Sequence, residues 1–260
     1  MKIALLLKGS SVNKYKHWQF KEEVYVDYEK SLTNIKNNIV DLYDCDVFFH
    51  TWKNEEFKNR YDNLISDYTP VSYKIEKDIP GSHGPELGAK MIQTAKCVIE
   101  TFLDHIEKTN THYDLVIVSR FDLYFAEKLN LEKIINNFNL DDKVVFVHET
   151  KTYVWGNDLT LPKNLTEKQG LDDNFIIFTV SALRNYYSCL FLKTETIAID
   201  RNPKWFNPKQ HPSLHHLYYL MDEDTKIINL HILLDKKCKH MHSIVKLYGE
   251  KKTVRIAPYE

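Results

Sequence analysis

The chain has 260 residues, of which 43% are hydrophobic and 27% charged, and its formal net charge is −1. The composition is typical of a folded globular protein, and the length suits one medium α/β domain with a sizeable core. The near-zero charge excludes a global field that would attract nucleic acid or an anionic membrane, so any binding must come from a local site.

Strands and helices alternate in the first half of the chain. An apolar run at residues 3–7 predicts a buried strand that ends in a tight loop at Lys8 and Gly9. Residues 11–23 have no clear period. Apolar side chains at helical spacing, and compact apolar or alternating runs between them, predict the next elements. Helices are expected near residues 28–39, 57–68 and 91–106, and strands at 45–50, 71–75 and 115–118.

The second half is less regular. Strands are predicted at residues 144–148, 174–179 and 226–234, a helix at 182–192, and a long loop at 150–170. The alternation with short connections predicts an α/β fold, an open and mostly parallel sheet with helices on both faces. We expect a single domain over residues 1–260.

Ligands of such sheets bind beyond the carboxyl ends of the strands. Three polar segments are expected along that edge: Lys8-Gly9, His50-Thr51-Trp52 and Arg120-Asp122.

The cysteines and the N-terminus bear on the compartment. Cys45, Cys97, Cys189 and Cys238 occur singly, without a CxxC pair, which is typical of thiols in a reducing environment. The N-terminal apolar run is shorter than the roughly 7–15 residues of a signal peptide, and no stretch approaches the ~18 apolar residues of a membrane span. We therefore expect a soluble, cytoplasmic protein with no transmembrane segment.

Several common motifs are missing. The sequence has no GxxxxGK[ST] phosphate loop, no GxGxxG after the first strand, and neither HExxH nor GxSxG. The missing phosphate loop argues against a P-loop kinase or ATPase, and the missing GxGxxG argues against a dehydrogenase or a usual methyltransferase. The segment from Cys238 to His242 lacks a second ligand pair at zinc-finger spacing, so we interpret it as a polar strand end.

Asp122 follows a buried strand on the expected ligand edge. From that place a carboxylate can hold Mg²⁺ or Mn²⁺ against a nucleotide diphosphate and neutralise charge on a leaving group. Arg120 could share the task by a forked contact with phosphate oxygens. The alternative is a partly buried Arg120–Asp122 salt bridge that closes the strand.

The segment DLVIVSRFDLYF, residues 114–125, resembles the strand-plus-RxD segment of nucleotide-sugar glycosyltransferases with a GT-A-like, Rossmann-like fold. The chain is similar in particular to small bacterial and large-DNA-virus enzymes of that kind. The likeness runs in order from about residue 2 to 220, through five short motifs. These are the first strand with Gly9, the segment DVFFHTW at 46–52, SRFDLYF at 119–125, DDNF at 172–175, and His211-Pro212.

The resemblance implies transfer of a sugar from a nucleotide diphosphate sugar, such as a UDP-sugar, to a glycan acceptor. About residues 1–125 would form the nucleotide-binding half and about 126–260 the acceptor-binding half. It points to Asp173, with Asp172 beside it, as the general base for an inverting displacement, and to Mn²⁺ or Mg²⁺ on Asp122. Arg120 stands where the usual Asp-x-Asp has its first acid, so a metal-independent site that uses Arg120 remains open.

The other candidates each have a simpler interpretation. Lys8 and Gly9 could let backbone amides approach a nucleotide or phosphate, or form an ordinary turn. His50 and Thr51 could hydrogen-bond a ligand and Trp52 could stack on a base or sugar, or all three could be packed under the edge. Lys90 could reach a diphosphate, or lie on a solvated helix face.

Two other functions remain as alternatives. A noncatalytic nucleotide- or glycan-binding module could keep the same fold, and the absence of the first aspartate is the argument for it. A hydrolase or phosphatase could use Asp122 as a nucleophile, and it would release phosphate in place of a nucleoside diphosphate.

Overall fold

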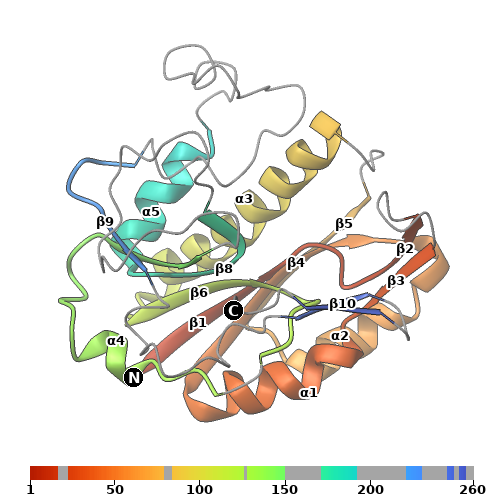
Figure 1. The fold of residues 1–260 in the computed structure, drawn as a ribbon, viewed down its shortest axis with the longest axis horizontal. Helices are drawn as coiled ribbons and strands as arrows, with labels where there is room; N and C mark the ends of the chain where they lie inside the picture. The colour runs from red at the N-terminus through yellow and green to blue at the C-terminus, as the bar shows by residue number, and fades with distance from the viewer. Residues whose placement is uncertain are drawn as a thin grey trace.

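The fold was analysed in a computed structural model of the chain (Figure 1). The structure describes residues 1–16, 23–78, 84–125, 128–149, 171–191, 221–229, 245–248 and 252–255. At residues 84–89 and 171–174, among others, it describes the backbone and not the side chains.

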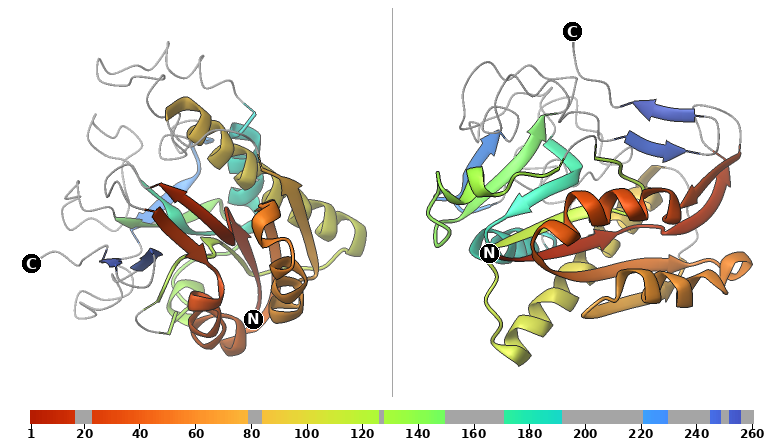
Figure 2. Two further views of the ribbon diagram at one scale, coloured as in Figure 1. Left: turned by 90° about the vertical axis from the view of Figure 1, so that its right-hand side faces the viewer. Right: turned by 90° about the horizontal axis from the view of Figure 1, so that it is seen from below.

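A seven-stranded mixed sheet forms the centre of the molecule (Figures 1 and 2). Four neighbouring strands are parallel, the next strand runs antiparallel to both of its neighbours, and the last two are parallel to each other. The spatial order is β5 (Ser72–Lys77), β4 (Asp44–Lys53), β1 (Lys2–Lys8), β6 (Leu115–Arg120), β8 (Leu171–Phe178), β7 (Val144–Glu149) and β9 (Lys226–Asn229).

Helices cover both faces of this sheet, as Figure 1 shows. On one face α1 (Glu29–Asn38) and α2 (Arg60–Tyr68) pack on a core that contains Leu5 and Ile117. On the other face α3 (Gly84–Thr109) and α5 (Val180–Cys189) pack on a core that contains Leu6 and Val118. Successive residues of a strand face opposite sides, so strands buried on both faces need unbroken apolar runs. The predicted α/β fold is confirmed.

Several small elements were not predicted. The aperiodic residues 11–23 contribute to a hairpin of β2 (Val12–Lys16) and β3 (Glu23–Asp27). Val12 and Val26 are buried in it. A second hairpin joins β10 (Val245–Tyr248) and β11 (Lys252–Arg255), and β10 contacts β3. The short helices are η1 (Val40–Leu42), η2 (Glu55–Phe57) and α4 (Glu132–Ile135). Elements this short bury too few side chains for a period to stand out.

The order of the strands creates a switch point beside β1. After β1 the chain adds β4 and then β5 on one side, and it crosses back to add β6 on the other. In open α/β sheets a ligand crevice lies outside the carboxyl ends of the strands at such a reversal. The fold is thus Rossmann-like, and it puts the ends of β1 and β6 at that place. None of the helices in the described ranges is long and apolar enough to span a membrane.

Candidate functional site

Two cations end the two strands at the switch point. Lys8 and Arg120 are register partners on the parallel strands β1 and β6. Their side chains project from the face of the sheet that α3 covers, because Leu6 and Val118, two residues earlier, belong to the core on that face. Lys8 is buried, and the Arg120 side chain is 24% exposed. The fold therefore brings two positive groups from distant parts of the sequence to one edge.

Arg120 and Asp122 form a bidentate ion pair. Arg120 Nε donates to Asp122 Oδ1 at 2.6 Å, and Nη2 donates to Oδ2 at 2.7 Å. The Asp122 side chain is only 2% exposed. This is the salt bridge that the sequence left open as an alternative. A forked contact of this kind fixes the plane and direction of the guanidinium.

Helix α1 holds the segment that carries Asp122. Ser31 Oγ donates to the carbonyl oxygen of Phe121. Asn34 Nδ2 donates to the carbonyl oxygen of Phe125 at 2.8 Å, and the amide of Phe125 donates to Asn34 Oδ1 at 2.6 Å. These contacts satisfy backbone groups that have left the sheet, and they fix the turn after β6. Sequence reasoning missed both α1 residues, because a polar side chain on a helix does not reveal its partner.

The loop after β1 is held from two sides and stays open at Gly9. Gly9 has a φ of 100°, which glycine adopts far more readily than other residues. A Cβ built there would meet nothing within 4 Å among the described residues other than its chain neighbours. The Gly9 amide donates to Thr94 Oγ1 on α3 at 3.0 Å. The Ser11 amide donates to Thr51 Oγ1 at 2.9 Å. The open side of Gly9 lets a ligand approach the backbone closely.

His50, Thr51 and Trp52 lie under this loop. The His50 and Thr51 side chains are fully buried, and Trp52 is 3% exposed. Thr51 supports Ser11, and the Trp52 carbonyl accepts a hydrogen bond from Tyr61. With so little exposure, the Trp52 ring offers no open face for a base in this arrangement. These residues position the loop after β1, which corresponds to the packed alternative.

Both ring nitrogens of His50 have partners. Nδ1 lies 2.7 Å from Thr94 Oγ1, and Nε2 lies 3.2 Å from a carboxylate oxygen of Glu76. Burial lowers the pKa of His50 although the Glu76 carboxylate acts in the opposite direction. Thr94 thus joins His50 to the Gly9 amide. Sequence reasoning did not identify Thr94 or Glu76. Thr94 lies on the buried face of α3, where a threonine is easily interpreted as an ordinary core residue.

Lys90 lies on α3 beside Trp52. Its ammonium group is 5.5 Å from the centre of the Trp52 ring and forms an ion pair with Asp78. A cation over an indole face is a favourable contact. Lys90 is therefore held beside Trp52, near the carboxyl end of β4, and its charge is balanced by Asp78.

The direction of β8 brings Asp172 and Asp173 to the same edge. The pairing of Val118 with Ile176 shows that β8 runs antiparallel to β6. The start of β8 therefore lies toward the carboxyl end of β6, where Arg120 is. The backbone of both aspartates belongs to β8, but their side chains lie outside the described residues. His211-Pro212, residues 150–170 and the Cys238–His242 segment also lie outside them.

Asp122 is engaged by Arg120 in this arrangement. Both of its oxygens accept from Arg120, so a divalent cation on Asp122 would share those oxygens with the guanidinium or displace it. Within the described residues, the group of three or more metal-ligating side chains that lie close together is His50, Glu76 and Cys97, and Asp122 does not belong to it. Mg²⁺ and Mn²⁺ favour sets of several oxygen ligands.

Comparisons with known proteins give distant likenesses. No protein-family model and no curated protein sequence matches the chain. One solved structure is a nucleoside-diphosphate-sugar pyrophosphorylase from Vibrio cholerae, at 12% identity over 88% of this chain and 91% of that chain, with a TM-score of 0.44. Another is an inositol-1-phosphate CTP transferase from T. maritima, at 11% identity over 88% and 85%, with a TM-score of 0.42. Likenesses at this level carry no argument about activity.

Proposed function

We propose that the chain is a glycosyltransferase that moves a sugar from a nucleotide diphosphate sugar, such as a UDP-sugar, to a glycan acceptor. One observation carries the proposal. Lys8 and Arg120 are paired across β1 and β6 at the switch point, beside the open side of Gly9. The resemblance of DLVIVSRFDLYF to the strand-plus-RxD segment of such enzymes supports the same function.

The diphosphate of the donor is the ligand that suits this edge. Its oxygens carry negative charge, which the Lys8 ammonium can balance. The charge of the Arg120 guanidinium is balanced by Asp122, but its other N–H groups can still donate hydrogen bonds to phosphate oxygens. Asp122 acts as a positioning residue, because its two hydrogen bonds fix the direction of the Arg120 guanidinium. Gly9 allows the donor to approach the backbone without a side chain in the way.

The reaction is a direct displacement at the anomeric carbon. Asp173, with Asp172 as its neighbour, takes the proton from an acceptor hydroxyl, and that oxygen forms the new bond to the sugar. The bond between the anomeric carbon and the diphosphate oxygen breaks, and the nucleoside diphosphate leaves. Lys8 and Arg120 stabilise the charge that grows on the leaving group. Direct displacement inverts the anomeric centre.

Cationic side chains take the place of a metal in this scheme. Usual enzymes of the resembled kind use an Asp-x-Asp metal site, and this chain has Arg120 in place of the first acid. With Asp122 engaged by Arg120, the leaving diphosphate is stabilised by protein cations. Turnover is therefore expected to persist in EDTA.

The test is a panel of nucleotide sugars, with release of nucleoside diphosphate as the readout, in EDTA and in Mn²⁺. We expect release from one donor class, enhanced by a glycan acceptor, and lost in Arg120→Ala but not in the exposed control Arg184→Ala. Binding of the nucleotide without turnover would identify a noncatalytic module. Release of inorganic phosphate would identify the hydrolase alternative, and strict dependence on Mn²⁺ would overturn the metal-free scheme.

A further inference from the structure

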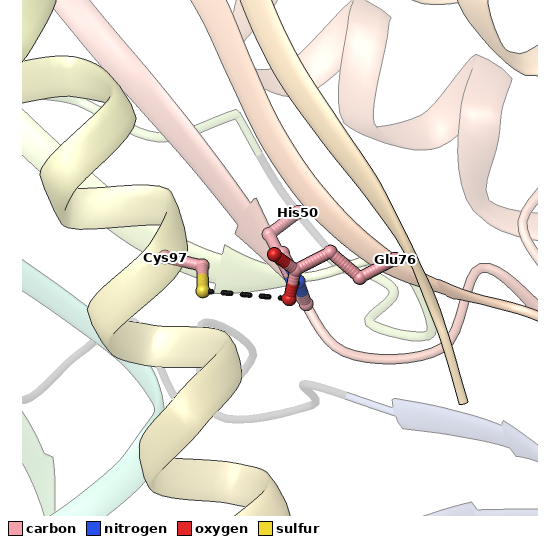
Figure 3. A group of neighbouring side chains, drawn as sticks. All are labelled: His50, Glu76 and Cys97. Carbon is pink, nitrogen blue, oxygen red and sulfur yellow. Dashed lines mark hydrogen bonds and ion pairs between the residues drawn. The ribbon is translucent and has the colours of Figure 1, made fainter. Parts of the chain in front are cut away.

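Three side chains from three elements meet behind the loop after β1. His50 lies within the buried part of β4, Glu76 lies near the end of β5, and Cys97 lies on α3 (Figure 3). Their ligand atoms all lie within 4.8 Å of one another. His50 Nε2 is 3.2 Å from Glu76 Oε2, and Cys97 Sγ is 3.7 Å from the same oxygen.

These distances match the spacing of ligands around a tetrahedral zinc ion. Zn–S, Zn–N and Zn–O bonds of about 2.3, 2.0–2.1 and 2.0–2.2 Å place neighbouring N and O ligands about 3.4 Å apart, and S and O ligands about 3.6 Å apart. The His50–Glu76 and Cys97–Glu76 distances differ from these values by at most about 0.2 Å. The His50 and Cys97 ligand atoms lie within 4.8 Å of each other, compared with about 3.6 Å around zinc, so binding would bring them closer by at most about 1.2 Å.

The ligand types of His50, Glu76 and Cys97 also favour a zinc-class transition metal. A thiolate, an imidazole and a carboxylate together suit Zn²⁺ and its neighbours among the transition metals, and they do not suit Mg²⁺ or Ca²⁺. His50 and Cys97 are buried, whereas the Glu76 side chain is 42% exposed. The cluster is therefore reachable from solvent through Glu76, and three protein ligands leave a fourth position for water.

The surroundings support the ligands. A metal-bound imidazole needs a partner for its other nitrogen, and His50 Nδ1 has Thr94 Oγ1 at 2.7 Å. A threonine hydroxyl can donate to a bare nitrogen or accept from an N–H, so it serves both tautomers. Gln93 Nε2 donates to Cys97 Sγ at 3.2 Å. Burial raises the pKa of the Cys97 thiol to about 11, so the thiolate forms only together with the metal–sulfur bond.

We propose that His50, Glu76 and Cys97 form a binding site for one zinc-class transition metal ion. The thiol of Cys97 releases its proton to solvent as the metal–sulfur bond forms. Because Thr94 bonds both His50 and the Gly9 amide, the bound ion fixes the loop after β1 through that hydroxyl. The site is structural with respect to sugar transfer and does not depend on the proposed function.

Cobalt titration of the metal-free full chain tests the proposal. Co²⁺ bound by a thiolate gives a sulfur-to-cobalt charge-transfer band, and tetrahedral Co²⁺ gives strong visible bands. We expect both signals to saturate at one Co²⁺ per chain and to disappear when Zn²⁺ is added. A wild-type protein without a charge-transfer band would overturn the proposal.

Matched variants locate the ion. Cys97→Ser should remove the charge-transfer band, whereas Cys189→Ser, which changes a buried thiol on α5, and Cys238→Ser should retain it. Glu76→Gln keeps the thiol and the fold but should weaken Co²⁺ binding by more than about 10–100-fold, the cost of losing an outer-shell partner. A band that survives Cys97→Ser or Glu76→Gln at full affinity, or that vanishes in Cys238→Ser, would contradict the site.

Discussion

Arg120 holds Asp122 through two hydrogen bonds of 2.6 and 2.7 Å, at the end of a strand whose other residues are buried. The two hydrogen bonds let the carboxylate fix the orientation of the guanidinium. Because the two charges neutralise each other, both groups can lie at the end of a buried strand. A buried carboxylate without a cation would be costly, whereas a paired one fixes the direction of its partner.

The strength of this pair can be measured by a double-mutant cycle. We expect Asp122→Ala to lower the free energy of unfolding by about 3 kcal/mol, the lower end for a buried pair, because Arg120 is partly exposed. Urea unfolding of both single variants and the double variant gives the coupling energy. The exposed pair Arg184–Glu107 is the control, with a coupling below about 1 kcal/mol. Equal couplings for the two pairs would contradict the assignment.

Lys8 should contribute to nucleotide affinity more than to folding. Lys8→Met keeps the stem of the side chain and removes the charge, so a lost charge-assisted contact of about 1.5–3 kcal/mol predicts roughly 10–100-fold weaker binding of UDP. Isothermal titration calorimetry with UDP measures the change. Lys58→Met, on the exposed stretch before α2, should leave the affinity unchanged. The same affinity in both variants would place the diphosphate elsewhere.

The Thr94 hydroxyl should contribute more to the free energy of unfolding than a hydroxyl that bonds only within its own helix. Thr94→Val removes the partner of the Gly9 amide and of His50 Nδ1, so we expect a loss of about 1–3 kcal/mol and faster hydrogen exchange at Gly9. Thr101→Val is the matched control, because the Thr101 hydroxyl donates to the Cys97 carbonyl oxygen, within α3 itself. Mass spectrometry after exchange compares the two. Identical protection at Gly9 would refute the link.

Gly9 is expected to resist substitution for two separate reasons. Its φ of 100° is strained for any residue with a Cβ, so Gly9→Ala should lower the stability by about 1–2 kcal/mol. Apart from its chain neighbours, a methyl group there meets no atom of the described residues within 4 Å, so it would project into the space proposed for the donor. Ser10→Ala is the neighbouring control. Thermal unfolding and UDP titration separate the two effects, and unchanged UDP affinity in Gly9→Ala would move the donor away from this loop.

Local sequence pattern alone predicts the buried strands β1 and β6, the helices around them, and Arg120 and Asp122 at the end of β6 and just beyond it. Apolar periodicity records which side chains leave water, and burial of a strand or helix face depends mainly on local pattern. The expected α/β class followed from the alternation of these elements, and the edge that gathers Lys8 and Arg120 followed from parallel pairing.

Which side chains come into contact depends on how distant elements are arranged in the folded chain. The apolar pattern of a strand does not reveal the direction in which the strand pairs with its neighbours. The antiparallel pairing of β8 with β6, which brings Asp172 and Asp173 toward Arg120, could therefore not be predicted from the residues of β8. The hydrogen bonds from Thr94 to Gly9 and His50 join three elements far apart in the chain. Hydrogen bonds and ion pairs depend on distances of a few ångströms between such elements, and a pattern of burial along one chain does not contain those distances.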